Sequence, residues 1–363
     1  MNKGFKIAYK ATIIILAIIA ATLMASIVLW IIGADVSRTF YTICIEPLTN
    51  KLHLTEVLIR SIPLCIIALG VCVAYRAGII NIGAEGQMAI GILSFTGVAL
   101  AFPSIPRVIL LPLCLLSAII GGAIWGCIPG ILKAKLNVSE LLSTVMLNYI
   151  AAQFYSLCLR TIYLDPSEKI FGTGTPQSMR LTENIWLSRI SGRLHSGIII
   201  ALVLALLIWL LMWKTTTGYK MRASGSSARS ARYGGISVAF YVTLAMVISG
   251  ALAGFAGGIE IAGVHRRAIE GVTNNYGFSG VVVALFGLLH PAGIVPASFF
   301  FGLMIYGATL APTKVGVPAN IVQVMQGIII IVIVTAQMVL SNTYLQDRVY
   351  RKYKSFKGGE KNA

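Results

Sequence analysis

Long apolar runs separated by short polar segments recur along the whole of this 363-residue sequence. A helix needs about 20 apolar residues to cross the hydrocarbon core of a bilayer. Only 11% of the residues are charged and the mean hydropathy is +0.85, values typical of a multi-pass membrane protein and not of a soluble globular one. We therefore predict an all-α integral membrane protein, with residues 1–363 forming a single transmembrane domain. The expected membrane-spanning helices, about ten in number, are 11–32, 56–74, 84–102, 108–131, 140–159, 197–213, 237–258, 277–289, 293–310 and 319–340.

The distribution of positive charge predicts how these helices are oriented. If both termini are cytoplasmic, 17 of the 29 Lys and Arg residues lie inside and most acidic residues lie outside. Short loops rich in Lys and Arg stay in the cytoplasm. The first apolar run is longer than that of a secretory signal, so we expect it to remain as the first helix. The net charge of +17 then reflects membrane topology and contact of the basic tail, about 341–363, with anionic lipid; it does not indicate a nucleic-acid partner.

Two loops differ in character from the short connections. The outer loop, about 160–196, mixes both charge signs and is expected to carry a short surface helix. The inner loop, about 214–236, has five cations and no acid, with glycines spaced around Arg222 and Arg232. Such a loop is either a simple topology determinant or a short helix lying on the membrane that receives a cytosolic partner. The sequence alone leaves both interpretations open.

Two features inside the apolar segments indicate a packed bundle with a polar pathway. Glycines recur every four residues at 122–130 and 250–258, a spacing that lets helix backbones approach closely in lipid. Ten helices also divide into two sets of five, which suggests inverted halves. The third and eighth helices occupy matching positions and both are abnormal: one begins at the glycine-rich stretch Asn81–Gln87, and the other is short, follows Thr273–Ser279 and ends at His290-Pro291. Interrupted helices in matching positions indicate a transport pathway.

Polar side chains in and beside these segments are the candidates for contact with a transported solute. Three of them have a structural alternative. Glu85 is also suited to capping the third helix, and Asn148 and Tyr149 are also suited to hydrogen bonding between helices. The second carboxylate near a helix end, Glu260, is expected at the membrane interface. The candidate pathway residues are Asn81, Glu85, Gln87, Asn148, Tyr149, Asn274, Asn275 and Ser279.

Several kinds of chemistry have no signature in the sequence. It contains no G-x-x-x-x-G-K-[ST], G-x-S-x-G, H-E-x-x-H or C-x-x-C motif, and its four histidines and six cysteines are scattered. We therefore predict no enzymatic activity, no metal and no cofactor, and a conduit driven by another subunit. An ion-coupled secondary transporter, which would need buried acids or a sodium site, is the alternative.

Five sequence blocks, in order, resemble the permease subunits of bacterial ABC importers in the ribose, branched-chain amino acid and nucleoside permease superfamily, and most closely the nucleoside-type members. The resemblance extends over roughly 55–310. Its blocks are Asn81-Ile-Gly-Ala-Glu-Gly-Gln87, Glu140-Leu-Leu-Ser-Thr-Val-Met-Leu-Asn-Tyr-Ile150, Gly218-Tyr-Lys-Met-Arg-Ala-Ser-Gly225, Ser249-Gly-Ala-Leu-Ala-Gly-Phe-Ala-Gly-Gly-Ile-Glu260 and Gly277-Phe-Ser-Gly-Val-Val-Val-Ala-Leu285.

This resemblance implies uptake of a nucleoside or, alternatively, of ribose or another simple sugar, across the bacterial cytoplasmic (inner) membrane. It also implies a cytosolic tandem-domain ABC ATPase that uses the ATP, a second homologous permease forming a heterodimer, and an extracytoplasmic substrate-binding protein or lipoprotein. The inner loop departs from the family in having Ser227-Ala-Arg-Ser230 where an acidic residue is common. By the same resemblance, the residues that dock the ATPase are Gly218, Tyr219, Arg222, Gly225 and Arg232.

Overall fold

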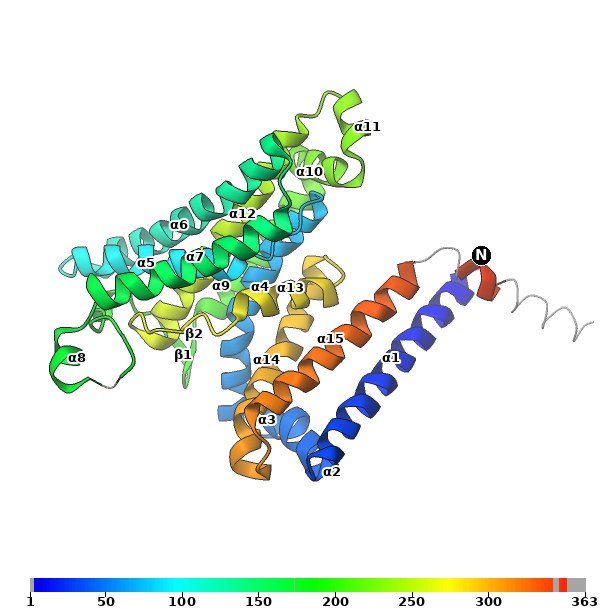
Figure 1. The fold of residues 1–363 in the computed structure, drawn as a ribbon, viewed down its shortest axis with the longest axis horizontal. Coiled ribbons are helices and arrows are strands. Elements are labelled where there is room, and N and C mark those ends of the chain that lie inside the picture. The colour runs from blue at the N-terminus through cyan, green and yellow to red at the C-terminus, as the bar shows by residue number, and fades with distance from the viewer. Residues whose placement is uncertain (1–2, 173, 342–345, 351–363) are drawn as a thin grey trace, which may run out of the picture. The chain divides into compact units, whose positions relative to one another are not determined.

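The computed structural model describes residues 3–172, 174–341 and 346–350, and most of them are helical (Figure 1). The long apolar segments each form a helix because a backbone inside lipid must satisfy its own hydrogen bonds. The longer helices are α1 (Lys3–Ile31), α4 (Lys51–Arg76), α5 (Ala84–Ala101), α6 (Arg107–Leu136), α7 (Glu140–Thr161), α9 (Gly197–Lys214), α12 (Val238–Glu260), α14 (Pro291–Val315) and α15 (Ala319–Ser341).

Shorter elements join them. The outer loop contains α8 and a two-stranded antiparallel sheet, the inner loop contains α10 and α11, and the π-helical turn η3 extends α12. The short elements are α2 (Val36–Phe40), η1 (Tyr41–Ile45), α3 (Glu46–Thr49), α8 (Pro166–Phe171), η2 (Glu183–Ile185), β1 (Arg189–Ser191), β2 (Leu194–His195), α10 (Thr216–Ser226), α11 (Ala228–Tyr233), η3 (Ile261–His265) and α13 (Tyr276–Phe286).

All ten predicted apolar runs contain a helix, and the fold class is that of an all-α membrane protein. Among the residues that the structure describes, seven helices are long and apolar enough to cross a bilayer, and they match the second to seventh and the ninth predicted runs. The other three runs contain shorter apolar helices at Ile15–Ile31, Tyr276–Phe286 and Asn320–Ile329. The short surface helix expected in the outer loop is present as α8, and the inner loop forms two short helices.

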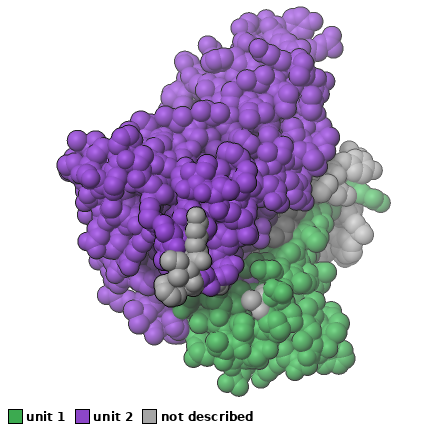
Figure 2. Space-filling model, turned by 60° about the vertical axis from the view of Figure 1, so that its left-hand side comes forward, with its two compact units in different colours: residues 1–47, 306–363 green, residues 48–305 purple. Residues whose placement is uncertain are grey.

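The chain divides into two compact units, coloured separately in Figure 2. Unit 1 comprises residues 1–47 and 306–363, and in it α1 lies beside α15. The backbones of Ile43 and Gly307 also meet there, since a Cβ at Gly307 would lie 2.7 Å from the Ile43 Cα. Unit 2, residues 48–305, contains the helices that build the candidate site. In Figure 1, α10 and α11 lie at the opposite end of unit 2 from α8.

Helix α4 is the core of unit 2. Its most apolar 18-residue window is 89% buried within the protein, whereas those of α6 and α9 are 28% buried. A helix that is apolar on all sides is stable only when other helices surround it or lipid does. Helices α9, α12 and α13 pack around α4, so protein takes the place of lipid.

The two glycine stripes face each other across the contact between α6 and α12. A Cβ at Gly122 would lie 2.8 Å from the Gly254 Cα, and one at Gly126 would lie 2.6 Å from the Met246 carbonyl oxygen. Cβ atoms do not fit at such distances, so glycine is what allows these two backbones to touch. The predicted close packing is therefore confirmed, and it brings α12 against α5 as well, where Gly91 meets Gly254.

Candidate functional site

A cavity of about 510 Å³ lies between α5, α7 and the segment that leads into α13. Three elements that are distant in sequence thus meet at one place, and they are the predicted third, fifth and eighth membrane helices. The wall is a mixture of aromatic, amide, hydroxyl and carboxylate side chains. Its polar and aromatic lining residues are Glu85, Asn148, Tyr149, Gln153, Tyr155, Ser156, Glu270, Thr273, Asn275 and Phe278.

Glu85 joins two of these elements. It lies in the first turn of α5, but its carboxylate accepts hydrogen bonds from the backbone N–H groups of Asn275 (3.1 Å) and Gly277 (2.7 Å) at the start of α13. A negative charge is favourable there because the first N–H groups of a helix have no partner inside the helix. Glu85 therefore caps the eighth predicted helix, and the same side chain lines the cavity.

Asn148 fastens α7 to the turn before α5. Its side-chain N–H donates to the carbonyl oxygen of Ile82 (2.9 Å), and its side-chain oxygen accepts from the N–H of Gly86 (2.9 Å). Both polar atoms of this buried amide thus bond to backbone. The neighbouring Tyr149 is 66% exposed and lines the cavity. Its hydroxyl is therefore more accessible to a solute than the Asn148 amide, which is bonded to backbone.

Asn81 and Gln87 lie behind the cavity wall. Asn81 is 0% exposed and Gln87 1%, and the Asn81 side-chain N–H donates to the Gln87 side-chain oxygen (2.9 Å) and to the Ser249 hydroxyl (2.8 Å). The Asn81 oxygen accepts from the Gly83 N–H (2.8 Å). This closed network ties the irregular 77–83 segment to α12, and neither amide lines the cavity.

The polar segment before α13 places its residues in different environments. Asn274 and Asn275 both adopt left-handed backbone conformations (φ 44° and 58°), which Asn tolerates better than most residues. Asn275 lines the main cavity, whereas Asn274 lines a smaller one of about 200 Å³ with Glu260, His265 and Tyr276. Ser279 is half-buried in α13 and lines neither.

Glu260 is buried within the protein, and its place at the membrane interface stays a prediction. It is 4% exposed, at the end of α12, with the His265 Nε2 3.4 Å from its carboxylate. The π-helical turn η3 places the two residues on the same side, since five residues complete one turn there.

Sequence reasoning missed a second group of cavity residues on α7 and the 266–275 segment. The Glu270 carboxylate accepts from the Ser156 hydroxyl (2.6 Å) and pairs with Arg160 (2.8 Å), and the Tyr155 hydroxyl donates to the Ile269 carbonyl oxygen (3.0 Å). The bonds to Ser156 and Arg160 hold the pKa of the Glu270 carboxyl below its usual range. No motif identified these residues, although Ser156 and Arg160 share a face of α7 with Asn148 and Ala152 at helical spacing.

Helix α10 of the inner loop is held against α9 and the end of α4 by two of the predicted coupling residues. A Cβ at Gly218 would lie 2.6 Å from the Met212 Cα of α9, and one at Gly225 would lie 2.6 Å from the Gly78 nitrogen after α4. Larger residues would push α10 away at either point. The Thr215 hydroxyl oxygen caps α10 by accepting from the Gly218 N–H (3.1 Å).

A cluster around Trp213 connects α10 to the end of α13. The guanidinium groups of Arg76 and Arg222 lie 5.5 and 5.8 Å from the Trp213 ring centre, and the His290 ring lies 4.6 Å from it. The Arg76 Nε donates to the Leu289 carbonyl oxygen (3.0 Å). Leu289 and the preceding Leu288 both have positive φ, which is strained for leucine.

The remaining predicted coupling residues lie at the surface. Tyr219 is 61% exposed, and Arg232 lines an open hollow of about 680 Å³ with Arg229 and the 82% exposed Tyr233. In the part of the chain that the structure describes, no three His, Cys, Asp or Glu side chains are grouped so as to hold a metal ion.

Comparison with protein families finds one that matches most of the chain. Residues 53–334 match the family described as branched-chain amino acid transport system / permease component. The match begins in α4, ends in α15 and includes every element of the cavity and of the inner loop.

Three curated proteins are similar over most of their lengths. The glucose ABC transporter permease protein TsgB13 of Haloferax volcanii is 32% identical, over 89% of this chain and 87% of its own. The guanosine ABC transporter permease protein NupP of Bacillus subtilis is 33% identical (89% and 92%). The nucleoside ABC transporter permease protein NupB of Lactococcus lactis is 32% identical (88% and 90%).

Proposed function

The chain belongs to the permease family of branched-chain amino acid transport systems and is a multi-pass subunit of an ABC transporter; from this premise, we propose that it forms the pathway for nucleoside uptake across the cytoplasmic membrane. The observation that carries the proposal is the cavity where α5, α7 and the segment before α13 meet. Its volume of about 510 Å³ lies within the range of about 300–1,000 Å³ that is usual for small-molecule sites.

The character of the wall favours a nucleoside over a simple sugar. Tyr149 and Phe278 offer aromatic surface on which a base can stack, and Asn275 and Thr273 offer polar atoms for ribose hydroxyls. Asn148 is already bonded to backbone, so it shapes the cavity. Asn81 and Gln87 stabilise the segment behind the cavity wall. Two similar proteins are named for guanosine or nucleosides, and one for glucose. A sugar permease is therefore the second candidate.

Helix α13 supplies a mechanical connection between the cavity and the inner loop. Its first turn is held by Glu85, and the residues after its last turn bond to Arg76, which stacks on Trp213 beside Arg222 of α10. We propose that movement of α10 shifts α13 through this cluster and thereby opens or closes the cavity. A helix of three turns is stiff enough to transmit such a displacement.

The proposal includes the partners and orientation that family membership implies. The chain crosses the membrane ten times with both termini cytoplasmic, and α10 and α11 dock a cytosolic tandem-domain ATPase through Tyr219, Arg222 and Arg232. A second homologous permease completes the pathway. An extracytoplasmic binding protein delivers substrate at the opposite face.

The decisive test is ATP-dependent uptake by proteoliposomes that contain the complete complex. Radiolabelled guanosine is expected to enter, with competition by excess inosine or cytidine and none by glucose or ribose. Competition by the sugars alone would identify the second candidate. Uptake that resists ATP depletion but stops with an uncoupler would instead indicate an ion-coupled transporter.

A further inference from the structure

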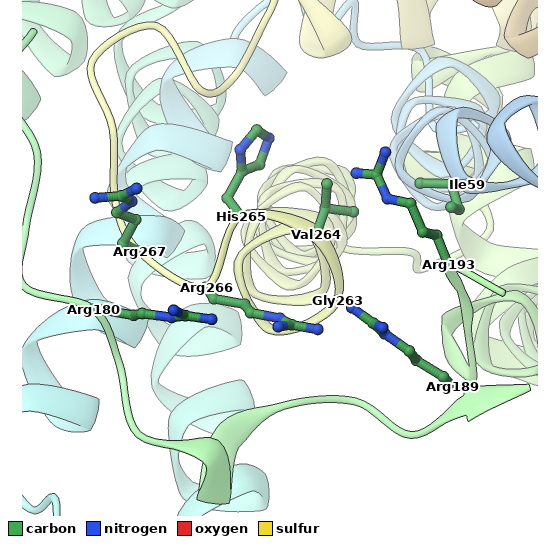
Figure 3. A pocket seen from close by; sticks show the side chains of 9 residues that line it. All are labelled: Ile59, Arg180, Arg189, Arg193, Gly263, Val264, His265, Arg266 and Arg267. Atoms are coloured by element: carbon green, nitrogen blue, oxygen red, sulfur yellow. The ribbon is translucent and has the colours of Figure 1, made fainter.

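Five arginines surround a second hollow, of about 310 Å³, at the end of α12 (Figure 3). They come from three segments: the stretch after α8, the β1–β2 hairpin and the turn after η3. In Figure 3 the guanidinium groups of Arg189 and Arg266 extend toward each other, with Arg180 in the same row behind Arg266. The lining residues are Ile59, Arg180, Arg189, Arg193, Gly263, Val264, His265, Arg266 and Arg267.

The backbone at Arg266 is unusual and faces this hollow. Arg266 has φ 60°, its N–H donates to the Ile261 carbonyl oxygen (2.8 Å), and its carbonyl oxygen accepts from the Leu181 N–H (2.9 Å). A left-handed residue commonly ends a helix, but glycine is the residue best suited to that conformation. An arginine there accepts backbone strain, which points to a use for its side chain.

The cation of Arg266 is held in place by an aromatic ring. Its guanidinium carbon lies 3.8 Å from the Trp186 ring centre, and that of Arg180 lies 5.3 Å from the same ring. Trp186 is fixed in turn, because Arg107 donates to its carbonyl oxygen (2.7 Å). Stacking on an aromatic face leaves the edge N–H donors of a guanidinium available to an oxyanion.

Negative charge on the described residues leaves much of this cluster uncompensated. Glu56 pairs with Arg193 (2.8 Å), but Arg180, Arg189 and Arg266 make no ion pair within the described ranges. Burial together with the charges of Arg189 and Arg180 lowers the pKa of the Arg266 guanidinium from its ordinary value. Positive charges held close together repel one another, and a bound anion removes this repulsion.

The positive surface is larger than one small anion. An adjoining hollow of about 550 Å³ shares Arg189 and Arg266 and adds Arg107, with Glu183 as its single acidic lining residue. Phosphate or a single carboxylate fills only a part of this surface. A protein with several acidic side chains spaced along its own surface matches all of it.

The cluster is also connected directly to the substrate cavity. Residues 266–270 run beside 176–181, with hydrogen bonds from the Ser178 N–H to the Ala268 carbonyl oxygen (2.8 Å) and from the Glu270 N–H to the Pro176 carbonyl oxygen (3.0 Å). Glu270 lines the substrate cavity. Only three residues therefore separate Arg266, which faces one hollow, from Glu270, which faces the other.

We propose that this arginine cluster is the docking site for acidic side chains of the extracytoplasmic substrate-binding protein, and that docking reaches the substrate cavity through residues 266–270. The inference rests on the proposed function, because it assigns a site to one of that function's partners. Carboxylates of the binding protein bridge Arg189 and Arg266, neutralise the cluster and fix the 266–270 segment, which positions Glu270 at the cavity.

Arg266→Gly is the sharpest variant for a test, because glycine suits the left-handed backbone and the arginine side chain is removed without backbone strain. The complete complex in nanodiscs is titrated with the binding protein that restores substrate-stimulated ATP hydrolysis. We expect the dissociation constant to rise at least tenfold for Arg266→Gly and for Arg189→Glu, with an unchanged or higher melting temperature for Arg266→Gly. Lys51→Glu, the same charge change at an exposed cation outside both hollows, should stay within twofold of wild type.

Two competition measurements distinguish a docking site for acidic side chains from a site for a small anion. Hexaglutamate should compete with the binding protein on the wild type and lose that effect on Arg266→Gly, whereas 10 mM inorganic phosphate should not displace it. Wild-type dissociation constants in both arginine variants would overturn the proposal, and so would displacement by phosphate. If no binding protein stimulates even the wild-type complex, the proposed function itself fails, and the two results are thereby distinguishable.

Discussion

The carboxylate of Glu85 accepts a 2.7 Å hydrogen bond from the backbone N–H of Gly277, a residue 192 positions later in the chain. The bond joins the first turn of α5 to the first turn of α13, and it spans one edge of the cavity between α5, α7 and α13. The absence of a side chain at Gly277 is part of this contact, because a Cβ there would lie 2.7 Å from the Ala84 carbonyl carbon.

Glu85→Gln should weaken this connection without changing the size of the side chain. The neutral amide loses the favourable interaction with the helix N-terminus, and a hydrogen bond to a charged group contributes about 1.5–3 kcal/mol. We expect a lower melting temperature and a several-fold loss of guanosine uptake. Asp347→Asn, which neutralises an exposed carboxylate outside the cavity, is the control, and uptake equal to wild type in Glu85→Gln would contradict the assignment.

Gly254→Ala should destabilise the protein, because the added methyl group meets the Gly122 backbone. Overpacking at such a contact costs about 1–3 kcal/mol. Gly327→Ala is the matched control: this glycine is also inside a helix, α15, and a Cβ there meets nothing within 4 Å. Thermal unfolding in detergent should show a decrease for the first variant only, and equal melting temperatures would refute close packing of α6 on α12.

Trp213→Leu should uncouple ATP hydrolysis from substrate. The substitution removes the ring on which Arg76 and Arg222 stack, and with it the contact between α10 and the end of α13. Basal hydrolysis by the complex should persist, while its stimulation by binding protein and nucleoside falls at least fivefold. Trp209→Leu on the same helix, whose ring contacts Lys214, should retain stimulation. Loss of stimulation in both variants would show that α9 tolerates neither change and would remove Trp213 from the coupling path.

Arg222→Glu should abolish substrate-stimulated hydrolysis while leaving the protein in the membrane, and Arg222→Lys should keep part of it. Reversal of the charge places a carboxylate beside Trp213 and in the surface of α10 that we propose to dock the ATPase. Hydrolysis by the reconstituted complex is the measurement, with membrane content checked by immunoblot. Undiminished stimulation in Arg222→Glu would show that this residue has no part in coupling.

His195 should make the stability of the protein depend on pH. The ring is 1% exposed, and its Nδ1 accepts from the Gly197 N–H (3.2 Å), an arrangement that requires the neutral form. Burial lowers the His195 pKa below 6.5, although nearby Glu260 acts in the opposite direction. The unfolded chain therefore binds the proton more readily, so stability is lost as the pH falls below about 6.5 and is unaffected above it.

The melting temperature of the wild type should accordingly fall between pH 7 and pH 5. His195→Gln, which cannot be protonated in this range, should show a smaller decrease. A second histidine, His265, lies with its Nε2 3.4 Å from the Glu260 carboxylate, and His265→Gln is measured in parallel as the matched histidine control. Equal slopes for the wild type and His195→Gln would exclude His195 as the source.

Much of the fold follows from the sequence because lipid imposes a simple physical requirement. Apolar runs of sufficient length become helices in a bilayer whatever their neighbours are, and all ten predicted runs contain one. The glycine stripes at 122–130 and 250–258 also predicted contact, and the structure pairs them with each other. Family membership was visible in the same way, from short blocks such as Asn81–Gln87.

The roles of individual polar residues were decided by tertiary structure. Glu85, Asn81 and Asn148 are polar groups in or beside apolar segments, and the sequence made all three pathway candidates while leaving a structural alternative open for Glu85 and Asn148. Their partners lie 62 to 192 residues away: Glu85 caps α13, Asn148 clamps a turn, and Asn81 bonds to Ser249. A side chain whose hydrogen bonds end on distant backbone has no sequence pattern that reveals it.

The arginine cluster shows the same division. In sequence its members, at 180, 189, 193, 266 and 267, are ordinary cations of two segments that are predicted to lie outside, and the positive-inside count treats them only as exceptions. The fold brings them around one hollow because 176–181 pairs with 266–270. Sequence by itself determined that the chain lies in a membrane and to which family it belongs, since hydropathy and short motifs are local properties. Only the tertiary structure decided which charges and amides meet, because those contacts form between segments that the chain itself holds far apart.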